Sequence, residues 1–223
     1  MWSRISRYLQ SILAMKNTDW LALAQRIQSI AQAGIFYTQN PYDKDRYEEL
    51  SSLSVEILHK LTDEPIEKIA PLFTAERDGY QTPKVDIRAV VFNEEGKLLF
   101  VREKVDGCWS LPGGWADVGY SPAEVAVKEV REESGIDVKA VRLLGVFDKK
   151  FHNHPPEPWY VYKLFLLCEQ TGGQLSDTTL ETSEVAYFGR NELPPLSLVR
   201  NTESQVMTMF SYLDNPEQAV YFE

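Results

Sequence analysis

The feature that most constrains this chain of 223 residues is the stretch 111–136, LPGGWADVGYSPAEVAVKEVREESGI. Its glycine-rich first half predicts a sharply turning loop, and its second half predicts a short helix. Glu129, Glu132 and Glu133 follow the spacing i, i+3, i+4, so a helix places their carboxylates on one face. Carboxylates so close together repel one another unless a cation lies among them. Oxygen-only ligands favour Mg²⁺ or Mn²⁺, so this face is a candidate metal site.

Local sequence signals support the loop and the helix. Ser121 is a suitable N-cap, Pro122 fits the first helical position, and Glu124 completes a capping box. Gly135 is placed to end the helix, because glycine tolerates the left-handed conformation. Gly113 and its neighbours let the preceding loop turn sharply and bring its carbonyls near the acids.

This stretch resembles the Nudix box, whose pattern is G-x5-E-x7-R-E-U-x-E-E-x-G-U with U a bulky aliphatic residue. Gly114 fills the first glycine, and residues 129–136 fill the tail of the pattern in register. Two positions depart from it. Tyr120 replaces a glutamate and removes one possible metal ligand, whereas Lys128 replaces an arginine and keeps the charge without the planar fork.

The resemblance implies a role for each box residue. In the family the tail glutamates bind divalent metal together with a loop glycine carbonyl, which here are Glu129, Glu132, Glu133 and the carbonyl of Gly113. The implied reaction is attack of water on a pyrophosphate phosphorus, with Mg²⁺ or Mn²⁺ as cofactor. A metal-bound glutamate is a poor base, so Glu181 and Glu184, just before a late strand, are candidate proton acceptors, with Glu181 preferred. A plain surface acid is the alternative reading of Glu181.

Four further residues are candidates for binding the substrate. Arg88, within a strand-like run, can clamp a phosphate, and an ion pair with Asp86 or a box glutamate is the alternative. Trp115 and Tyr120 can stack on a base or cover a quaternary ammonium, and packing is the alternative. His154 lies in the stiff run His-Asn-His-Pro-Pro, where substrate contact and a merely rigid loop are both open.

The first third of the chain has a helical pattern. Apolar residues at helical spacing predict helices over 18–34, 45–61 and 65–73. A short connection favours an antiparallel hairpin over a helix-turn-helix DNA reader, which would need a basic recognition helix. This region resembles the helical extension of a Nudix subgroup that cleaves nucleoside diphosphates linked to another moiety. We therefore expect a helical dimerisation region over 1–78 and a Nudix domain over 83–223.

After the linker at 78–83 the apolar period changes from helical to strand-like. Strands are expected at 85–92, 98–102, 138–147, 159–169 and 184–189, with a last helix at 201–213. Strands, a helix, more strands and a final helix predict an α/β fold. The resemblance makes this a Nudix-type α/β/α sandwich with a mixed sheet, preceded by a small N-terminal helical domain.

The predicted function is divalent-metal-dependent hydrolysis of the pyrophosphate bond in a nucleoside diphosphate linked to another moiety. CDP-choline, giving CMP and phosphocholine, is the favoured substrate, and ADP-ribose or another sugar nucleotide is the alternative. The alternative from another class is a Nudix module that senses a nucleotide without turnover. The presence of all three tail acids favours the enzyme, with a small-molecule nucleotide as substrate and a homodimer as its assembly.

Charge and cysteine content exclude some other classes. A net charge of −10 argues against general affinity for nucleic acid or an anionic membrane. No apolar run approaches the length of a membrane span, and two cysteines do not make a disulfide framework. Cys168 is expected to be buried and Cys108 partly exposed, both reduced in a cytoplasmic protein. An apolar stripe from Trp2 to Leu13 is expected to dock on the protein or on a partner subunit.

Overall fold

The computed structural model describes residues 17–62, 65–74, 81–176 and 181–223. The apolar stripe from Trp2 to Leu13 lies outside these described residues. The chain divides into two compact units. One unit extends to Pro83 and includes the segment Pro156–Tyr160, and the other comprises Lys84–Pro155 and Val161–Glu223.

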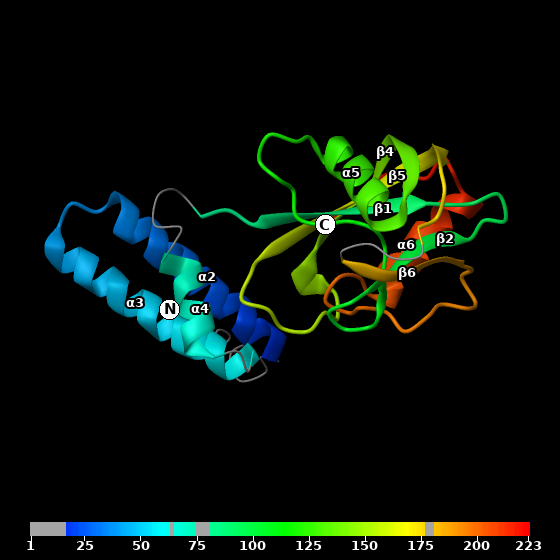
Figure 1. Cartoon of the computed structure of the whole chain (residues 1–223). Helices are drawn as coiled ribbons and strands as arrows, with labels where there is room; N and C mark the ends of the chain where they lie inside the picture. The colour runs from blue at the N-terminus through cyan, green and yellow to red at the C-terminus, as the bar shows by residue number, and fades with distance from the viewer. Residues whose placement is uncertain (1–16, 63–64, 75–80, 177–180) are drawn as a thin grey trace, which may run out of the picture. The chain divides into compact units, whose positions relative to one another are not determined.

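The first unit is helical. Helix α2 (Asn17–Tyr37) and helix α3 (Pro41–Thr62) lie side by side, and α4 (Ile66–Thr74) packs on α3 (Figure 1). The core of this unit consists of Ala24, Val55, Leu58 and Ile69. All three helices expected before the strands are present: α2 and α3 are longer than the apolar pattern indicates, and α4 is shifted by one residue.

The second unit contains a mixed four-stranded sheet in the order β1-β5-β4-β7. Strand β1 (Lys84–Val91) is parallel to β5 (Val161–Gly173), β5 is antiparallel to β4 (Ile136–Asp148), and β4 is parallel to β7 (Tyr221–Phe222). Strand β5 begins two residues later than expected. The segment before it belongs to the helical unit, where Gln25 Nε2 donates hydrogen bonds of 2.9 Å to the carbonyls of Glu157 and Trp159.

A second, antiparallel sheet has the order β3-β2-β6. It consists of β3 (Trp109–Ser110), β2 (Leu98–Glu103) and β6 (Thr182–Phe188). The remaining elements are α5 (Pro122–Ser134), the short 3₁₀ helix η1 (Lys149–Phe151) and α6 (Glu203–Asp214). Strands β3 and β7 have two residues each, which is too short to leave an alternating pattern in the sequence.

The alternation of β1 explains the layers. Ile87 and Ala89 point to one side and pack in the same cluster as Val125 and Val130 of α5. Val90 points to the other side, into a cluster shared with the second sheet and α6. The four-stranded sheet therefore has α5 on one face and β2 with α6 on the other, and this confirms the expected α/β/α sandwich (Figure 1).

Two smaller expectations about the chain can be compared with the structure. Cys168 is buried and Cys108 partly exposed, as the apolar pattern indicates, and both are free thiols. Over the described ranges, no helix is both long and apolar enough to span a membrane.

Candidate active site

Helix α5 has the caps that its sequence predicts. Ser121 is the N-cap, its hydroxyl accepts from the Glu124 N–H, and the Glu124 carboxylate accepts from the Ser121 N–H at 2.7 Å. At the other end Gly135 has φ +78° and donates its N–H to the Arg131 carbonyl. Both ends of the helix are thus fixed by hydrogen bonds, and the acids on its last turns are held in place.

The loop before α5 runs along β1 at very close range. Ile87 N–H donates to the Gly114 carbonyl and Ala89 N–H to the Pro112 carbonyl, both at 2.8 Å. Gly113, between them, has φ +151°, and a Cβ there would lie 1.9 Å from the Ile87 carbonyl oxygen. Gly113 N–H donates to Glu133 Oε2 at 2.9 Å. The loop and the helix are therefore joined directly at one of the box acids.

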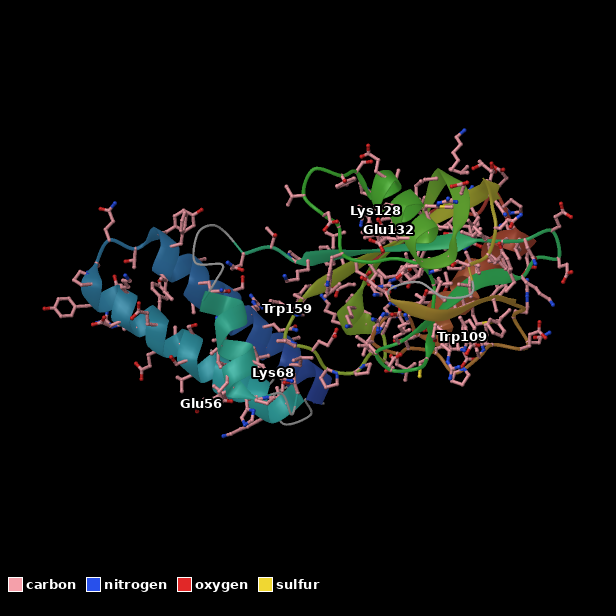
Figure 2. The ribbon with its side chains drawn as sticks, viewed as in Figure 1. Glu56, Lys68, Trp109, Lys128, Glu132 and Trp159 are labelled. Carbon is pink, nitrogen blue, oxygen red and sulfur yellow. The ribbon has the colours of Figure 1, made fainter. Side chains whose placement is uncertain are left out.

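Two of the box acids converge on one cation. Lys128 Nζ lies 3.3 Å from Glu129 Oε1 and 3.3 Å from Glu132 Oε2, as well as 3.7 Å from Asp117 Oδ2. Lys128 and Glu132 are labelled in Figure 2. The Glu132 side chain is 60% exposed, whereas that of Glu129 is 13% exposed. The lysine ammonium thus shows that these two carboxylates can share one positive charge.

The third box acid is directed differently. Glu133 is 4% exposed and turns toward the Gly113 N–H. In the part of the chain that is described, no three acidic, histidine or cysteine side chains already surround a common point. The donor set still fits a divalent cation, because three carboxylates come from consecutive turns of one helix and oxygen ligands suit Mg²⁺ or Mn²⁺.

Burial of these acids favours a bound cation. Burial raises the pKa of Glu133 to about 8, although the Arg88 guanidinium and the Gly113 N–H act in the opposite direction. Burial also raises the pKa of Glu129, against the lowering effect of Lys128, and the charge of Glu181 adds to the increase. Carboxyls in this position are costly to ionise without a counter-charge, which a divalent ion supplies.

The candidate proton acceptor, Glu181, is exposed and close enough to Glu129 to affect its pKa. Glu184, the other acid near the start of β6, forms an ion pair with Arg102 instead. The charge of Glu181 therefore acts on a box acid, whereas Glu184 is held by Arg102.

Arg88 lies in a buried ion pair. Its Nη2 is 2.9 Å from Asp86 Oδ1, its Nε donates to the same oxygen, and its Nη1 donates to the Leu111 carbonyl at 3.0 Å. The structure thus shows the ion pair with Asp86, which is the alternative to phosphate clamping that the sequence offers for Arg88. Through Leu111, the guanidinium also holds the start of the box loop.

The substrate candidates on the loops have different surroundings. Trp115 is 49% exposed and has Lys84 Nζ 6.0 Å from its ring centroid, and Tyr120 is 52% exposed. His154 Nδ1 lies 2.6 Å from the Leu198 carbonyl oxygen, which can only accept, so Nδ1 carries the proton. Its Nε2 is buried and finds no hydrogen-bond partner among the described residues. The two aromatic rings are open to a ligand, whereas the histidine offers one buried lone pair.

We expect His154 to make the protein sensitive to acid. Burial lowers its pKa to about 3 from the usual 6.5, so between these values the unfolded chain binds a proton that the folded chain does not. The free energy of unfolding should therefore fall as the pH decreases from 6.5, by at most about 1.4 kcal/mol per pH unit from this group. The free energy of unfolding is measured by urea denaturation at several pH values from 4 to 7. In His154→Gln, the part of its pH dependence that comes from this histidine should be absent. His59→Gln is the control, and an unchanged slope in His154→Gln would contradict the prediction.

Two residues near the site are absent from the sequence-based candidates. Lys163 is 1% exposed and pairs with Asp86, and burial lowers its pKa to about 8. A lone lysine in the apolar strand β5 is a signal that sequence analysis can detect. Asn201 is fully buried, accepts from the Leu111 N–H at 3.0 Å, and has an Nδ2 with no partner in the described part of the chain. Nothing in its local sequence marks it.

The fold and the box define a hydrolase of phosphorus-containing acid anhydrides, and comparison with known proteins gives its family. The family model described as "NUDIX domain" matches residues 82–210, and one described as "UDP-X-like, N-terminal oligomerisation domain" matches residues 18–73. The chain therefore belongs to the Nudix family and is a Nudix pyrophosphohydrolase with the helical extension that its sequence indicates.

Individual relatives agree with this assignment. The chain is 48% identical over 206 residues to the Bacillus subtilis (strain 168) protein named "Putative ADP-ribose pyrophosphatase YjhB", which covers 92% of this chain and 98% of the relative. A crystal structure of a UDP-X diphosphatase matches with 32% identity and a TM-score of 0.59, over 94% of this chain and 100% of that one. An ADP-ribose pyrophosphatase structure from Streptococcus suis matches with 40% identity and a TM-score of 0.57, over 64% and 100%.

Proposed function

We propose that this enzyme hydrolyses the pyrophosphate bond of a nucleoside diphosphate linked to another moiety. The observation that carries the proposal is the convergence of Glu129 and Glu132 on one cation, beside Glu133 and the loop at Gly113. The names of the relatives support ADP-ribose and UDP-linked compounds as substrates. CDP-choline stays a candidate, because exposed aromatic rings can cover a quaternary ammonium.

The acids of the site have two proposed roles, which are metal binding and proton transfer. Glu129, Glu132, Glu133 and the Gly113 carbonyl hold Mg²⁺ or Mn²⁺, and Glu181 accepts the proton of the attacking water. When bound, a divalent ion neutralises the pyrophosphate and lowers the pKa of water. The anionic substrate needs this local positive charge, because the protein as a whole carries −10.

The substrate is recognised by side chains on the loops and by Arg88 within β1. Trp115 and Tyr120 offer exposed faces for a base or a cationic headgroup, and His154 offers its Nε2 as an acceptor. Arg88 contributes by fixing the Leu111 carbonyl, and its positive charge favours a phosphate nearby. The ring at position 120 then shapes the pocket where the box pattern has an acid.

Product analysis on a panel of nucleotides tests the proposal. ADP-ribose, UDP-glucose and CDP-choline are each incubated with the enzyme and Mg²⁺ or Mn²⁺, and the released monophosphates AMP, UMP and CMP are separated. We expect hydrolysis of at least one compound, with the pyrophosphate bond cleaved and the turnover abolished by excess chelator. A protein that binds these nucleotides without cleaving any of them would be a sensing module, and the proposal would be wrong.

We also propose that the helical unit forms a homodimer. On α2, Trp20, Leu23 and Ile30 are exposed at a spacing that places them on one stripe, and α3 exposes Leu50 and Leu53 in the same way. Contiguous apolar surface of this kind is typical of an interface. The match to an N-terminal oligomerisation domain supports a second copy of the chain as the partner. The free thiols fit a reducing compartment, and we propose the cytoplasm.

We expect Ile30→Arg to break the dimer, since a charge placed in an apolar interface loses its hydration. Light scattering at micromolar concentration should give the mass of a dimer for the wild type and of a monomer for the variant. Val105→Arg, at an exposed apolar residue of the other unit, is the matched control and should leave the dimer intact. A wild-type monomer at this concentration would contradict the proposal.

A further inference from the structure

Lys128 is the residue whose surroundings the proposed function does not explain. Its ammonium is within 4 Å of three carboxylates, those of Glu129, Glu132 and Asp117 (Figure 2). Its side chain is 32% exposed. The two closest partners are box acids that a divalent ion also needs. The ammonium and the ion therefore compete for the same oxygens.

Simple stabilisation of the helix is a poor explanation for this arrangement. In an i,i+4 pair the favourable order is glutamate before lysine, whereas here Lys128 precedes Glu132. Position 120, which holds a glutamate in the box pattern, is a neutral tyrosine here and offers no carboxylate. The positive charge of Lys128 is thus directed at Asp117 and the box acids.

We propose that Lys128 is a tethered cation that bridges Glu129 and Glu132 in the metal-free enzyme and has to move away before a divalent ion binds between them. The flexible four-carbon stem allows this movement, because it can carry the ammonium toward solvent or Asp117. Glu129 and its partners raise the pKa of Lys128, so its charge is present throughout the neutral range. Lys128 would then set the divalent-ion affinity and keep the acids neutralised until an ion arrives.

The test is Mn²⁺ binding by metal-free, full-length protein, measured by isothermal titration calorimetry in the absence of nucleotide. Lys128→Met keeps most of the stem and removes the charge. We expect it to bind Mn²⁺ about tenfold more tightly than the wild type, because in the wild type the ammonium has to leave Glu129 and Glu132 before the ion can bind. Lys128→Arg keeps the charge and should stay within about threefold of the wild type. Equal or weaker Mn²⁺ binding by Lys128→Met would overturn the proposal.

A second lysine provides the matched control. Lys97 Nζ lies 3.3 Å from Glu95 and 3.4 Å from Glu192, and its side chain is 37% exposed, so it bridges two acids much as Lys128 does. Neither acid belongs to the box. Lys97→Met changes the net charge equally and should leave Mn²⁺ affinity unchanged. An equal gain in affinity in Lys97→Met would show a general charge effect and overturn the proposal.

Thermal unfolding gives a second measurement. Lys128→Met should unfold at a lower temperature than the wild type without metal, because Glu129 and Glu132 then repel each other, and saturating Mn²⁺ should restore the loss. A loss of the same size with and without Mn²⁺ would reduce Lys128 to a structural ion pair. The inference rests on the metal site of the proposed function, but its failure is distinguishable. If the wild type hydrolyses nucleotides but Lys128→Met binds Mn²⁺ with wild-type affinity, only the inference about Lys128 is wrong. If Lys128→Met binds Mn²⁺ more tightly but the wild type hydrolyses none of the nucleotides, only the proposed hydrolysis is wrong.

Discussion

Glu132→Gln and Glu133→Gln should each reduce kcat by about 10²-fold or more, and this is the largest effect that we expect on activity. Glutamine keeps the size of the side chain but loses the negative charge that holds a divalent ion. The fold should remain intact. Glu132 is largely exposed, and a glutamine at position 133 can still accept from the Gly113 N–H without adding a charge at this buried position.

Steady-state kinetics on the best substrate, with thermal unfolding of each variant, measures both parts of this prediction. Glu169→Gln is the control, because Glu169 is an exposed acid on β5 and its loss changes the net charge by the same amount. Wild-type turnover in either box variant, or in the presence of excess chelator, would show that these acids do not hold the catalytic ion. A fall in turnover accompanied by an equal fall in stability would make Glu133 a structural residue.

The parts of the fold that could be predicted from the sequence are formed by interactions between residues close together in the chain. The caps of α5 follow from Ser121, Glu124 and Gly135, since a cap is a contact between residues a few positions apart. Strand β1 follows from the apolar run expected as a strand at 85–92. The family resemblance adds the sandwich itself, because the box and the helical extension are recognised as patterns.

What could not be predicted depends on contacts between distant segments. Asn201 reaches Leu111 across 90 residues, and a buried asparagine leaves no periodic pattern. Strand β5 begins at Val161 because Gln25 holds the preceding carbonyls, which is also a distant contact. The pairing of Arg88 depends on a choice between Asp86 and the box acids that only three-dimensional geometry decides.

Gly113→Ala should have the largest effect on stability. The added Cβ would lie 1.9 Å from the Ile87 carbonyl oxygen, and that oxygen is backbone of β1, which is hydrogen-bonded to β5 and to the loop itself and therefore cannot easily move aside. The residue also has φ +151°, where a side chain is strained in any case. We expect the free energy of unfolding to fall by more than about 3 kcal/mol, measured by urea denaturation.

Gly119→Ala separates the two causes of that loss. Gly119 is in the same loop and has a positive φ of +96°, but a Cβ there would meet nothing within 4 Å. Its loss should therefore be only about 1–2 kcal/mol, the cost of the backbone conformation alone. If both variants lose the same amount, the close approach to Ile87 is unimportant. If Gly113→Ala folds well but loses activity, the loop has shifted to make room for the Cβ. The hydrogen bond from the Gly113 N–H would then be what positions the Glu133 carboxylate.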